Sequence, residues 1–331
     1  MAVEGAAPGG QELASARRAW SAGHWQQARR GAQGALATAA SEQDRGAEAA
    51  AALLLAQALA LESQFDWARR FARRAQLLSQ GLGDAAGALQ ALLAQSHAES
   101  ALGRDEQALR AASEAVDGAR HMPLMEAAAL NYMGVASLWA GDHDTARSVL
   151  DRACRLARGQ PGGPDASFQP LVNAAFAEVL HCADQRLRGE PVDVSPLEGL
   201  VGAARQLKKP GAAGGLVQAS PLAGLFLLEF GGFHGAHLAG DAARADAHYL
   251  ACLGLAARLP QGSWMQALVW WARLERAMAA RNVEEVLESA QALVHASGAG
   301  EHAPMKRLAL RLHAHAQGWL QEAPSFSATW F

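Results

Sequence analysis

The sequence predicts an all-α protein built as a solenoid of antiparallel helix pairs. Three observations support this prediction: the chain is rich in Ala and Leu, a short pattern of small residues recurs about every forty residues, and Pro and Gly cluster in a few stretches. Ala and Leu favour helices, whereas the β-branched and aromatic residues that favour strands are scarce. Repetition with a period near forty residues is typical of stacked helix pairs.

The recurring pattern is a small residue at a turn, an Ala five positions later and another small residue seven positions after that Ala. The block AGDHDTARSVLDRA shows it at Gly141, Ala146 and Ala153. The turn positions of the six blocks, the last of which is degenerate, are Gly23, Ser63, Gly103, Gly141, Gly240 and Arg281. The first four are separated by 40, 40 and 38 residues and the last two by 41. The gap of 99 residues between Gly141 and Gly240 leaves room for one irregular repeat.

Each position of the pattern has a physical role in a helix pair. The turn Gly can adopt a positive φ and end the first helix. The Asp that follows it, at positions 142 and 241, can cap the second helix. Ala146 lies where the two backbones approach most closely, so a larger side chain would not fit. Gly134 is the corresponding position on the first helix. Close packing there offsets the lower helix propensity of Gly, which costs about 1 kcal/mol relative to Ala.

Along the chain, these signals divide the sequence into five parts. They are a disordered N-terminus (1–12), an N-terminal block of four repeats (13–157), an irregular helix pair with Pro- and Gly-rich loops (158–221), a C-terminal block (222–325) and a tail (326–331). In the irregular section, the stretch RGQPGGPDASFQP (Arg158–Pro170) is expected to break the helices. The section is either a hinge between the two blocks or a tolerated surface insertion.

Four residues of one block resemble the tetratricopeptide repeat (TPR) signature: Gly134, Gly141, Asp142 and Ala146. The other blocks match it at the corresponding positions, and the resemblance extends from about Ser15 to Ala323 with a weak section near 160–220. Because TPR units normally have about 34 residues, this chain is similar to an extended variety with longer helices. The resemblance implies a right-handed superhelical solenoid of about seven to eight helix pairs.

A second resemblance concerns two longer segments, FQPLVNAAFAEVLHCADQRLRGEPVD and LACLGLAARLPQGSWMQALVWWARLE, together with the spacing of the units. These are similar to the N-terminal sensory TPR arrays of bacterial TPR-containing diguanylate cyclases, in which the array precedes a GGDEF domain. Neither GGDEF nor GGEEF occurs in this sequence. The resemblance therefore implies a sensor-like array without cyclase activity.

Composition narrows the classes of partner and compartment. The formal net charge is −3, from 29 basic and 32 acidic residues, so no polycationic surface for nucleic acid is expected. The three cysteines, Cys154, Cys182 and Cys252, are widely spaced in apolar helical surroundings, which is typical of reduced core thiols in a cytoplasmic protein. No signal peptide is expected, and the apolar stretches Ala49–Leu61 and Pro221–Gly240 are interpreted as buried helices rather than membrane spans.

Motifs for catalysis are lacking. The sequence contains no HExxH, GxSxG, Walker A or CxxC pattern, so we expect no enzyme and no cofactor. His234, His237 and Asp241 have a spacing that would place two imidazoles and a carboxylate on one side of a helix. Helix capping by Asp241 and a place on the inner face for the two His explain them better than a metal site, so we expect no metal.

The first helix of each TPR pair lines a concave groove, and its variable positions contact ligands. Together with Trp139 at the groove edge, the candidate ligand-binding residues are Arg17, Gln57, His97, Asn131, Trp139, His234, His237, Trp271 and Glu275. The alternative for each is core packing or simple solvation, although an exposed Trp271 would be a binding hot spot. The Lys and Asn pairs of a chaperone-tail carboxylate clamp are absent from the corresponding positions, which disfavours that function.

The sequence as a whole favours a non-catalytic solenoid that binds a protein or peptide as an interaction or sensory module in bacterial regulation. The alternative is a sensor of a small molecule or short signalling peptide, with the section 158–221 closing over the groove. An enzyme is a third hypothesis, which no motif supports. Neither nucleic acid nor membrane is expected as a partner, and dimerisation through an end repeat remains open.

Overall fold

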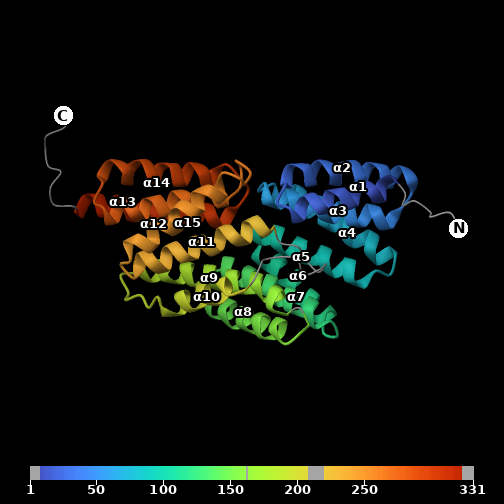
Figure 1. Ribbon diagram of the computed structural model, residues 1–331, viewed down its shortest axis with the longest axis horizontal. Coiled ribbons are helices and arrows are strands. Elements are labelled where there is room, and N and C mark those ends of the chain that lie inside the picture. Colours follow the sequence, from blue (N-terminus) through green and yellow to red (C-terminus); the bar gives the residue numbers. More distant parts are fainter. Residues whose placement is uncertain (1–7, 162, 208–219, 323–331) are drawn as a thin grey trace.

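The computed structural model describes residues 8–161, 163–207 and 220–322. These residues form fifteen α-helices and no strand, which confirms the predicted all-α solenoid (Figure 1). The first eight are α1 (Pro8–Ser21), α2 (Trp25–Glu42), α3 (Arg45–Leu61), α4 (Phe65–Gly81), α5 (Ala85–Ala101), α6 (Asp105–Gly118), α7 (Pro123–Trp139) and α8 (His143–Arg158). The other seven are α9 (Gly163–Leu187), α10 (Ser195–Arg205), α11 (Pro221–Leu238), α12 (Ala242–Ala256), α13 (Met265–Ala279), α14 (Val283–Gly298) and α15 (Ala303–Glu322).

Successive helices pack against each other, which gives seven pairs from α1/α2 to α13/α14, followed by α15. All six turn positions of the sequence pattern have a positive φ, including the two that are not glycine, Ser63 (60°) and Arg281 (55°). Gly189, between α9 and α10, also has a positive φ, of 71°. The pair α9/α10 is therefore the irregular repeat that fills the gap between Gly141 and Gly240.

The predicted caps are present at the second helices of two pairs. The Asp142 carboxylate accepts a hydrogen bond from the backbone N–H of Thr145 at 3.0 Å, at the start of α8. Asp241 accepts one from the backbone N–H of Arg244 at 3.0 Å, at the start of α12. Each bond satisfies one of the backbone donors that a helix N-terminus leaves unpaired.

Small residues lie where the helices of a pair meet. The positions five residues after each turn are all buried: Ala28, Ala68, Ala108, Ala146, Ala245 and Val286. A Cβ placed on Gly134 would lie 2.5 Å from Leu150 Cγ, closer than any ordinary carbon contact. The sequence interpretation of Gly134 as a packing position is confirmed.

The irregular section is more helical than its composition predicts. A break over Arg158–Pro170 was expected, and α8 does end at Arg158 within this stretch, but α9 begins again at Gly163 and continues through Pro170 for 25 residues. Pro170 removes one helical hydrogen bond, and packing of α9 against α8, α10 and α11 supports the helix on several sides. The Gly-rich stretch at 208–219 lies outside the described residues, as do 1–7 and the 326–331 tail, whereas α1 begins at Pro8, before the expected boundary at residue 13.

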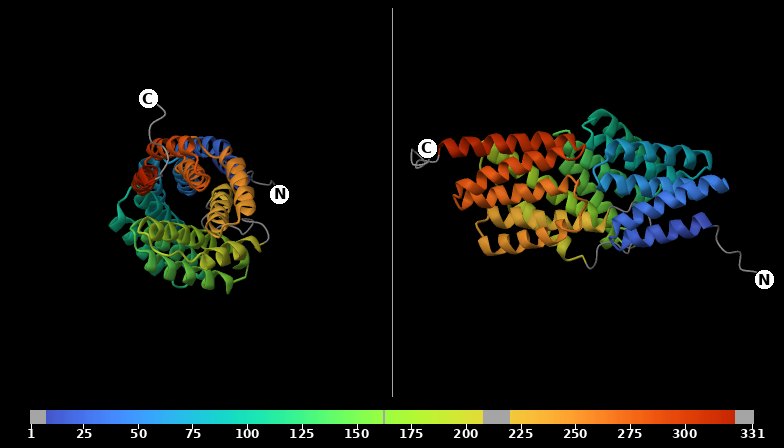
Figure 2. Two further views of the ribbon diagram at one scale, coloured as in Figure 1. Left: turned by 90° about the vertical axis from the view of Figure 1, so that its left-hand side faces the viewer. Right: turned by 90° about the horizontal axis from the view of Figure 1, so that it is seen from above.

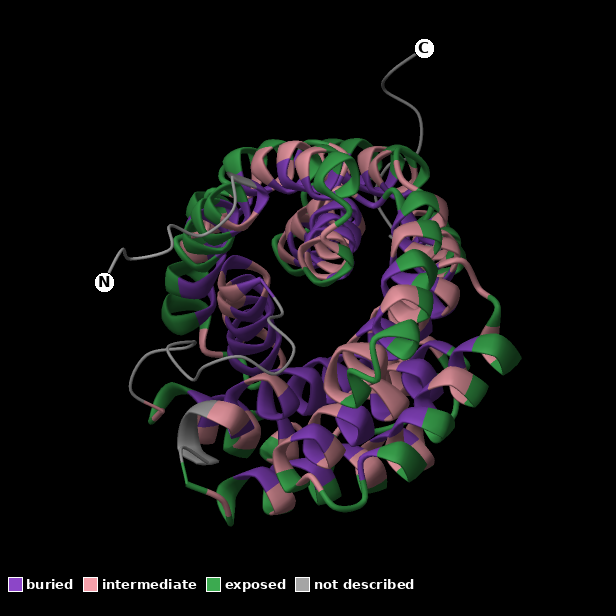
Figure 3. Ribbon diagram, turned by 90° about the vertical axis from the view of Figure 1, so that its right-hand side faces the viewer, coloured by how far each residue is buried: buried purple, intermediate pink, exposed green. Residues whose placement is uncertain are grey.

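Seen along the long axis, the helices run around a ring, with exposed residues on its outer rim and buried residues between the helices (Figures 2 and 3). The ring closes where the loops 257–264 and 299–302 meet the turns 22–25 and 62–66, and we call this junction the seam.

Four hydrogen bonds define the seam. Trp25 Nε1 donates to the carbonyl of Arg258 at 3.0 Å. Ser63 Oγ accepts a hydrogen bond from the backbone N–H of Trp264 at 2.8 Å. The backbone carbonyl of Ser63 accepts one from the N–H of Glu301 at 3.2 Å. The Glu301 carboxylate accepts a hydrogen bond from the backbone N–H of Asp66, in the first turn of α4, at 2.7 Å. Because these bonds join residues more than 200 positions apart, the solenoid is held as a ring rather than an open array.

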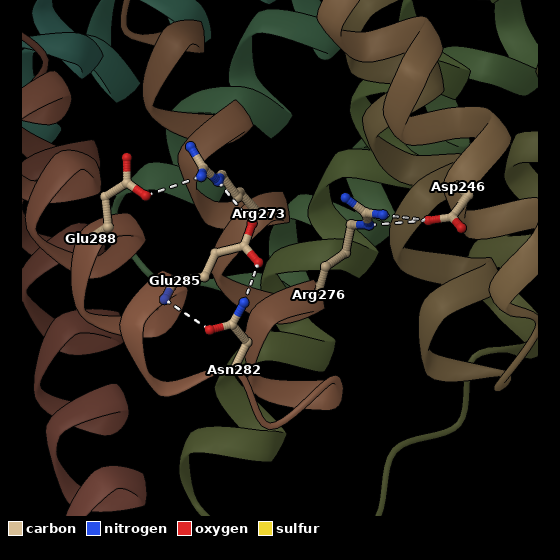
Figure 4. A network of polar contacts seen from close by, with 6 residues as sticks. All are labelled: Asp246, Arg273, Arg276, Asn282, Glu285 and Glu288. Carbon is tan, nitrogen blue, oxygen red and sulfur yellow. Dashed lines mark hydrogen bonds and ion pairs between the residues drawn. The ribbon is translucent and has the colours of Figure 1, made fainter.

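Ion pairs join the helix pairs of the C-terminal block on its surface (Figure 4). Arg276 on α13 contacts Asp246 on α12 at 2.7 Å, and Arg273 on α13 contacts Glu285 on α14 at 3.0 Å. Asn282 caps α14 by accepting from the backbone N–H of Glu285 at 3.2 Å. The two ion pairs join neighbouring helices and the Asn282 bond caps α14, so we assign the network a structural role.

The three cysteines and most of the two apolar stretches are buried, as predicted. All three cysteines are free and buried, and burial raises the pKa of the Cys154 and Cys182 thiols to about 11. The two apolar stretches lie in α3 and α11, which are largely buried. Among the described residues, no helix combines the length and apolarity needed to cross a bilayer.

Candidate functional site

A cavity lies inside the ring, lined by side chains of the odd-numbered helices from α1 to α13, and we call it the central cavity. Its empty volume, counted out to its mouth, is about 1040 Å³. Its aromatic lining residues are Trp20, His97, Tyr132, Trp139, Phe176 and Trp264. Its amide lining residues are Gln57, Asn131, Gln169 and Asn173. The remainder are small or aliphatic, together with Met265 and Ser220.

Three of the amides form a hydrogen-bonded chain between α7 and α9, which we call the amide ladder. Gln169 Nε2 donates to Asn173 Oδ1 at 3.1 Å, and Asn173 Nδ2 donates to Asn131 Oδ1 at 2.8 Å. Asn131 and Asn173 are both buried. Since each side-chain amide carries donors and acceptors like those of a peptide group, the ladder is suited to pair with amide groups of a bound chain.

Aromatic rings connect the cavity to the seam. Trp139, at the end of α7, lies 5.8 Å from Trp264 and 5.7 Å from Phe176, measured between ring centroids. Trp139 also contacts His302 in the seam at 4.8 Å. Ring contacts of this kind contribute about 0.5–1.5 kcal/mol beyond the area they bury. The same side chains therefore form the cavity wall and stabilise the closure of the ring.

The central cavity carries no formal charge at neutral pH on any described lining residue. Burial lowers the pKa of His97 to about 4, so its imidazole is neutral at pH 7. Burial also raises the pKa of Tyr132 to about 12, so its hydroxyl stays protonated. Because transfer of a charged group into such a site has a large desolvation cost, the cavity favours uncharged groups.

A second group of candidate residues lies on the C-terminal parts of α9, α11 and α13. The Glu275 carboxylate accepts from Trp271 Nε1 at 3.1 Å and from Arg186 Nη1 at 2.5 Å. His237 Nε2 lies 3.8 Å from the same carboxylate, and the His234 ring packs 4.7 Å from Trp271. Burial by itself would raise the pKa of Glu275, but Arg186, His234 and His237 together outweigh it and hold the pKa below its usual value. The group therefore brings three helices together around a partly buried ion pair between α9 and α13.

The structure separates the sequence-predicted residues into two sets and one outlier. Gln57, His97, Asn131 and Trp139 meet in the central cavity. The residues of the Glu275 group, which are His234, His237, Trp271 and Glu275, do not line that cavity. Trp271 is fully buried, so it offers no exposed contact, and Arg17 is exposed on α1 and lies in neither set.

Six of the aromatic and amide residues that line the cavity were not predicted: Trp20, Tyr132, Gln169, Asn173, Phe176 and Trp264. Gln169 and Asn173 lie in the section where the repeat pattern is weak, so the register of the neighbouring units does not extend to them. Trp264 precedes α13 in a loop, outside any helix face that periodicity could assign. A signal for the two amides does exist, because they are four positions apart and so share one face of a helix.

Among the described residues, no group of three or more His, Cys, Asp or Glu side chains is arranged to hold a metal ion. His234, His237 and Asp241 do not converge, since Asp241 caps α12 and His237 faces Glu275.

Comparisons with known proteins bear on the fold. No model of a known protein family matches the chain, and no curated protein matches it. Among solved structures, the chain is similar to a Rap protein whose crystal structure was determined in complex with competence and sporulation factor. The match has a TM-score of 0.59 and 12% sequence identity, and it covers 93% of this chain and 75% of that chain. At this identity the likeness shows the fold alone, an array of antiparallel helix pairs.

Proposed function

We propose that this chain is a non-catalytic binding module that captures a short apolar segment of a protein or peptide in the central cavity. The observation that carries the proposal is the amide ladder inside an uncharged aromatic cavity. The ladder supplies partners for the backbone of a bound segment, and the aromatic rings supply surface for its apolar side chains. Gln57, His97, Asn131 and Trp139 are the proposed contact residues.

The size of the cavity supports a short segment as the bound species. The enclosed volume of the cavity, about 140 Å³, lies below the usual range of small-ligand pockets, roughly 300–1,000 Å³, so it can enclose a few side chains of a short segment but not a folded domain. Similarity of fold to a Rap protein crystallised with a bound factor is consistent with a ligand-binding role for such a ring.

Selection from a random-peptide display library, followed by fluorescence-polarisation titration of the enriched peptides, tests the proposal. Enriched sequences should be apolar and low in charge. Asn131→Leu should weaken their binding by about tenfold or more, because it removes one end of the ladder and leaves buried amide groups unpaired. The control Gln33→Leu, an exposed position on α2, should leave affinity unchanged. No enrichment in repeated selections, or equal losses in both variants, would contradict the proposal.

A second candidate is a sensor of a small apolar molecule, favoured by the aromatic lining and the closed ring. A thermal-shift screen of metabolites distinguishes it, because a ligand that binds only the folded state raises the melting temperature. A rise with an apolar metabolite that Asn131→Leu abolishes, together with no peptide enrichment, would favour this candidate.

The proposed setting is regulatory, with the chain acting as an interaction or sensory module in the bacterial cytoplasm. Its repeat spacing resembles the sensory arrays of TPR-containing diguanylate cyclases, without their catalytic motif. A homodimer formed through an end repeat is a further expectation, which sedimentation of the purified chain would test.

A further inference from the structure

A second pocket adjoins the central cavity on the far side of Leu138 and Trp139, two residues that line both. It lies between the turn after α7, the last turns of α9 and the first half of α15, and its empty volume out to the mouth is about 740 Å³. Unlike the central cavity, it is lined by charged side chains, namely Asp184, Arg307 and Arg311.

The charges in this pocket do not balance. Asp184 is its one carboxylate among the described lining residues, and both of its oxygens are engaged. Oδ1 accepts from Arg311 Nη2 at 2.5 Å and Oδ2 accepts from Arg188 Nη1 at 2.6 Å. Arg307 takes part in none of the ion pairs formed within the described chain around this pocket. The guanidinium of Arg307, an exposed residue, therefore has no ion-pair partner among the described residues.

A neighbouring side chain also has unmet hydrogen-bonding capacity. The ring of His143 lines the pocket, and its Nδ1 is buried with no hydrogen-bond partner among the described residues. Its centroid lies 5.9 Å from that of His181, and burial lowers the pKa of His143. A neutral imidazole donates one hydrogen bond and accepts another, so it adds a polar contact beside the guanidinium.

The rest of the wall is apolar. Trp139, Leu180, Leu187 and Leu308 cover the sides of the pocket. A ligand that uses the whole pocket therefore needs a small anionic group and an apolar body attached to it. A single unneutralised guanidinium balances one negative charge, which fits a carboxylate better than a phosphate dianion.

We propose that this pocket binds the carboxylate that terminates an apolar molecule, with Arg307 as the primary contact. Resting on the proposed function, the inference is that a captured peptide places its C-terminal carboxylate here while the preceding residues extend past Trp139 toward the central cavity. An aliphatic acid carries the same chemistry, so the two sources are compared directly in the experiment.

The experiment is calorimetric titration of the full chain at pH 7 and low salt with two matched pairs of probes. The pairs are octanoate with octanamide, and acetyl-Leu-Leu with a free carboxylate against the same dipeptide amidated at its C-terminus. Each carboxylate should bind at least tenfold more tightly than its neutral amide, because a charge-assisted contact contributes about 1.5–3 kcal/mol. Preference for the dipeptide acid over octanoate identifies a peptide terminus as the source, and the reverse preference identifies a free acid.

Two substitutions test whether Arg307 is the residue that contacts the carboxylate. Arg307→Gln should lower the affinity for the carboxylate probes about tenfold and leave the amides unchanged. Unfolding in urea should be unaffected, because Arg307 is exposed and has no ion-pair partner within the described part of the chain. The control Arg73→Gln removes an exposed cation on α4 and should change nothing.

Equal binding of acids and amides, or an equal response of both variants, overturns the inference. That result would leave the peptide selection on the central cavity unaffected, so failure here and failure of the proposed function are distinguishable. Inorganic phosphate that competes as well as octanoate would also overturn it, since the apolar body would then contribute nothing.

Discussion

Ser63 and Arg281 show how strongly the helix pairs dictate the geometry of single residues. Both have a positive φ, which costs a non-glycine residue about 1–2 kcal/mol, at positions where other repeats have glycine. At Ser63 two hydrogen bonds offset part of this cost, because the side chain accepts from Trp264 and the carbonyl accepts from Glu301 across the seam. The turn conformation is therefore imposed by the packing of the two helices and not by the residue.

Gly134 should be intolerant of even one added carbon. Gly134→Ala places a Cβ about 2.5 Å from Leu150 Cγ, so we expect the free energy of unfolding to fall by about 1–3 kcal/mol despite the higher helix propensity of Ala. Gly254→Ala is the matched control, because Gly254 is also helical but has open space around its Cα, and this change should stabilise by up to about 1 kcal/mol. Urea denaturation measures both, and stabilisation by Gly134→Ala would contradict the packing argument.

His97 should make stability depend on pH. Its pKa in the folded state, about 4, lies below the ordinary 6.5, so as pH falls the unfolded chain binds the proton first. The stability is fully present above about pH 6.5 and is lost progressively toward pH 4, by about 3 kcal/mol for this residue.

The measurement is the free energy of unfolding between pH 4 and 7.5. His97→Leu should flatten the curve by roughly that amount, whereas His24→Gln, at an exposed position, should leave its shape unchanged. A His97→Leu curve as steep as that of the parent chain would show that His97 ionises freely in the folded state.

At the scale of helices, an Asp cap fixes the start of some helices of the solenoid. Asp142 and Asp241 cap α8 and α12, and the same bond occurs at α3, where Asp44 accepts from Ala47, and at α5. Caps therefore occur both within pairs and between them, so they define helix starts without distinguishing the two kinds of turn.

Loss of one cap should be measurable. Asp142→Ala removes the acceptor for the Thr145 N–H and should lower stability by about 1 kcal/mol. Asp144→Ala, one position into the same first turn and exposed, removes a charge near the helix N-terminus but no cap, so its effect should be smaller. Thermal unfolding of the two variants tests the difference, and equal shifts would assign the effect to charge alone.

At the scale of the whole molecule, the seam converts the solenoid into a ring. Trp139 and Trp264 belong to the cavity wall and contact the seam through His302, so the ring contacts and the candidate site share side chains. A change at the seam should therefore reach the central cavity without altering any residue that contacts a ligand directly.

Ser63→Ala should loosen the ring. It leaves the buried Trp264 N–H without its acceptor, and we expect a loss of about 1–3 kcal/mol and faster hydrogen exchange over 257–264 and 299–302. Ser289→Ala is the matched control, because Ser289 is equally buried but its hydroxyl has no partner, so its removal should be neutral or stabilising. Unchanged exchange at the seam in Ser63→Ala would show that the ring does not depend on this bond.

The sequence predicts the fold well because the six repeats that carry the pattern have the same turn geometry. The turn at Gly141, the cap at Asp142 and the close approach at Gly134 depend on neighbours within one helix pair, and all three occur as expected. Helix α9 is different, since Pro170 indicates a break locally while contacts with four other helices maintain the helix.

The candidate site is only partly predictable for the same reason. Asn131 and His97 follow from the repeat register, but their partner Asn173 comes from the irregular section and Trp264 from a loop. Their meeting depends on closure of the ring, and no periodic signal encodes a contact between segments as distant as Ser63 and Trp264. Local rules therefore predict the elements, while the cavity depends on how the whole superhelix curves.

The seam also restricts how this protein can change in evolution. In an open solenoid each repeat touches only its neighbours, so whole units can be gained or lost. Here an inserted or deleted helix pair would bring a different loop opposite Trp25 and Ser63, and the bonds to Arg258, Trp264 and Glu301 would be lost together. The number of helix pairs is thus fixed by geometry, and variation is expected to concentrate in side chains rather than in repeat count.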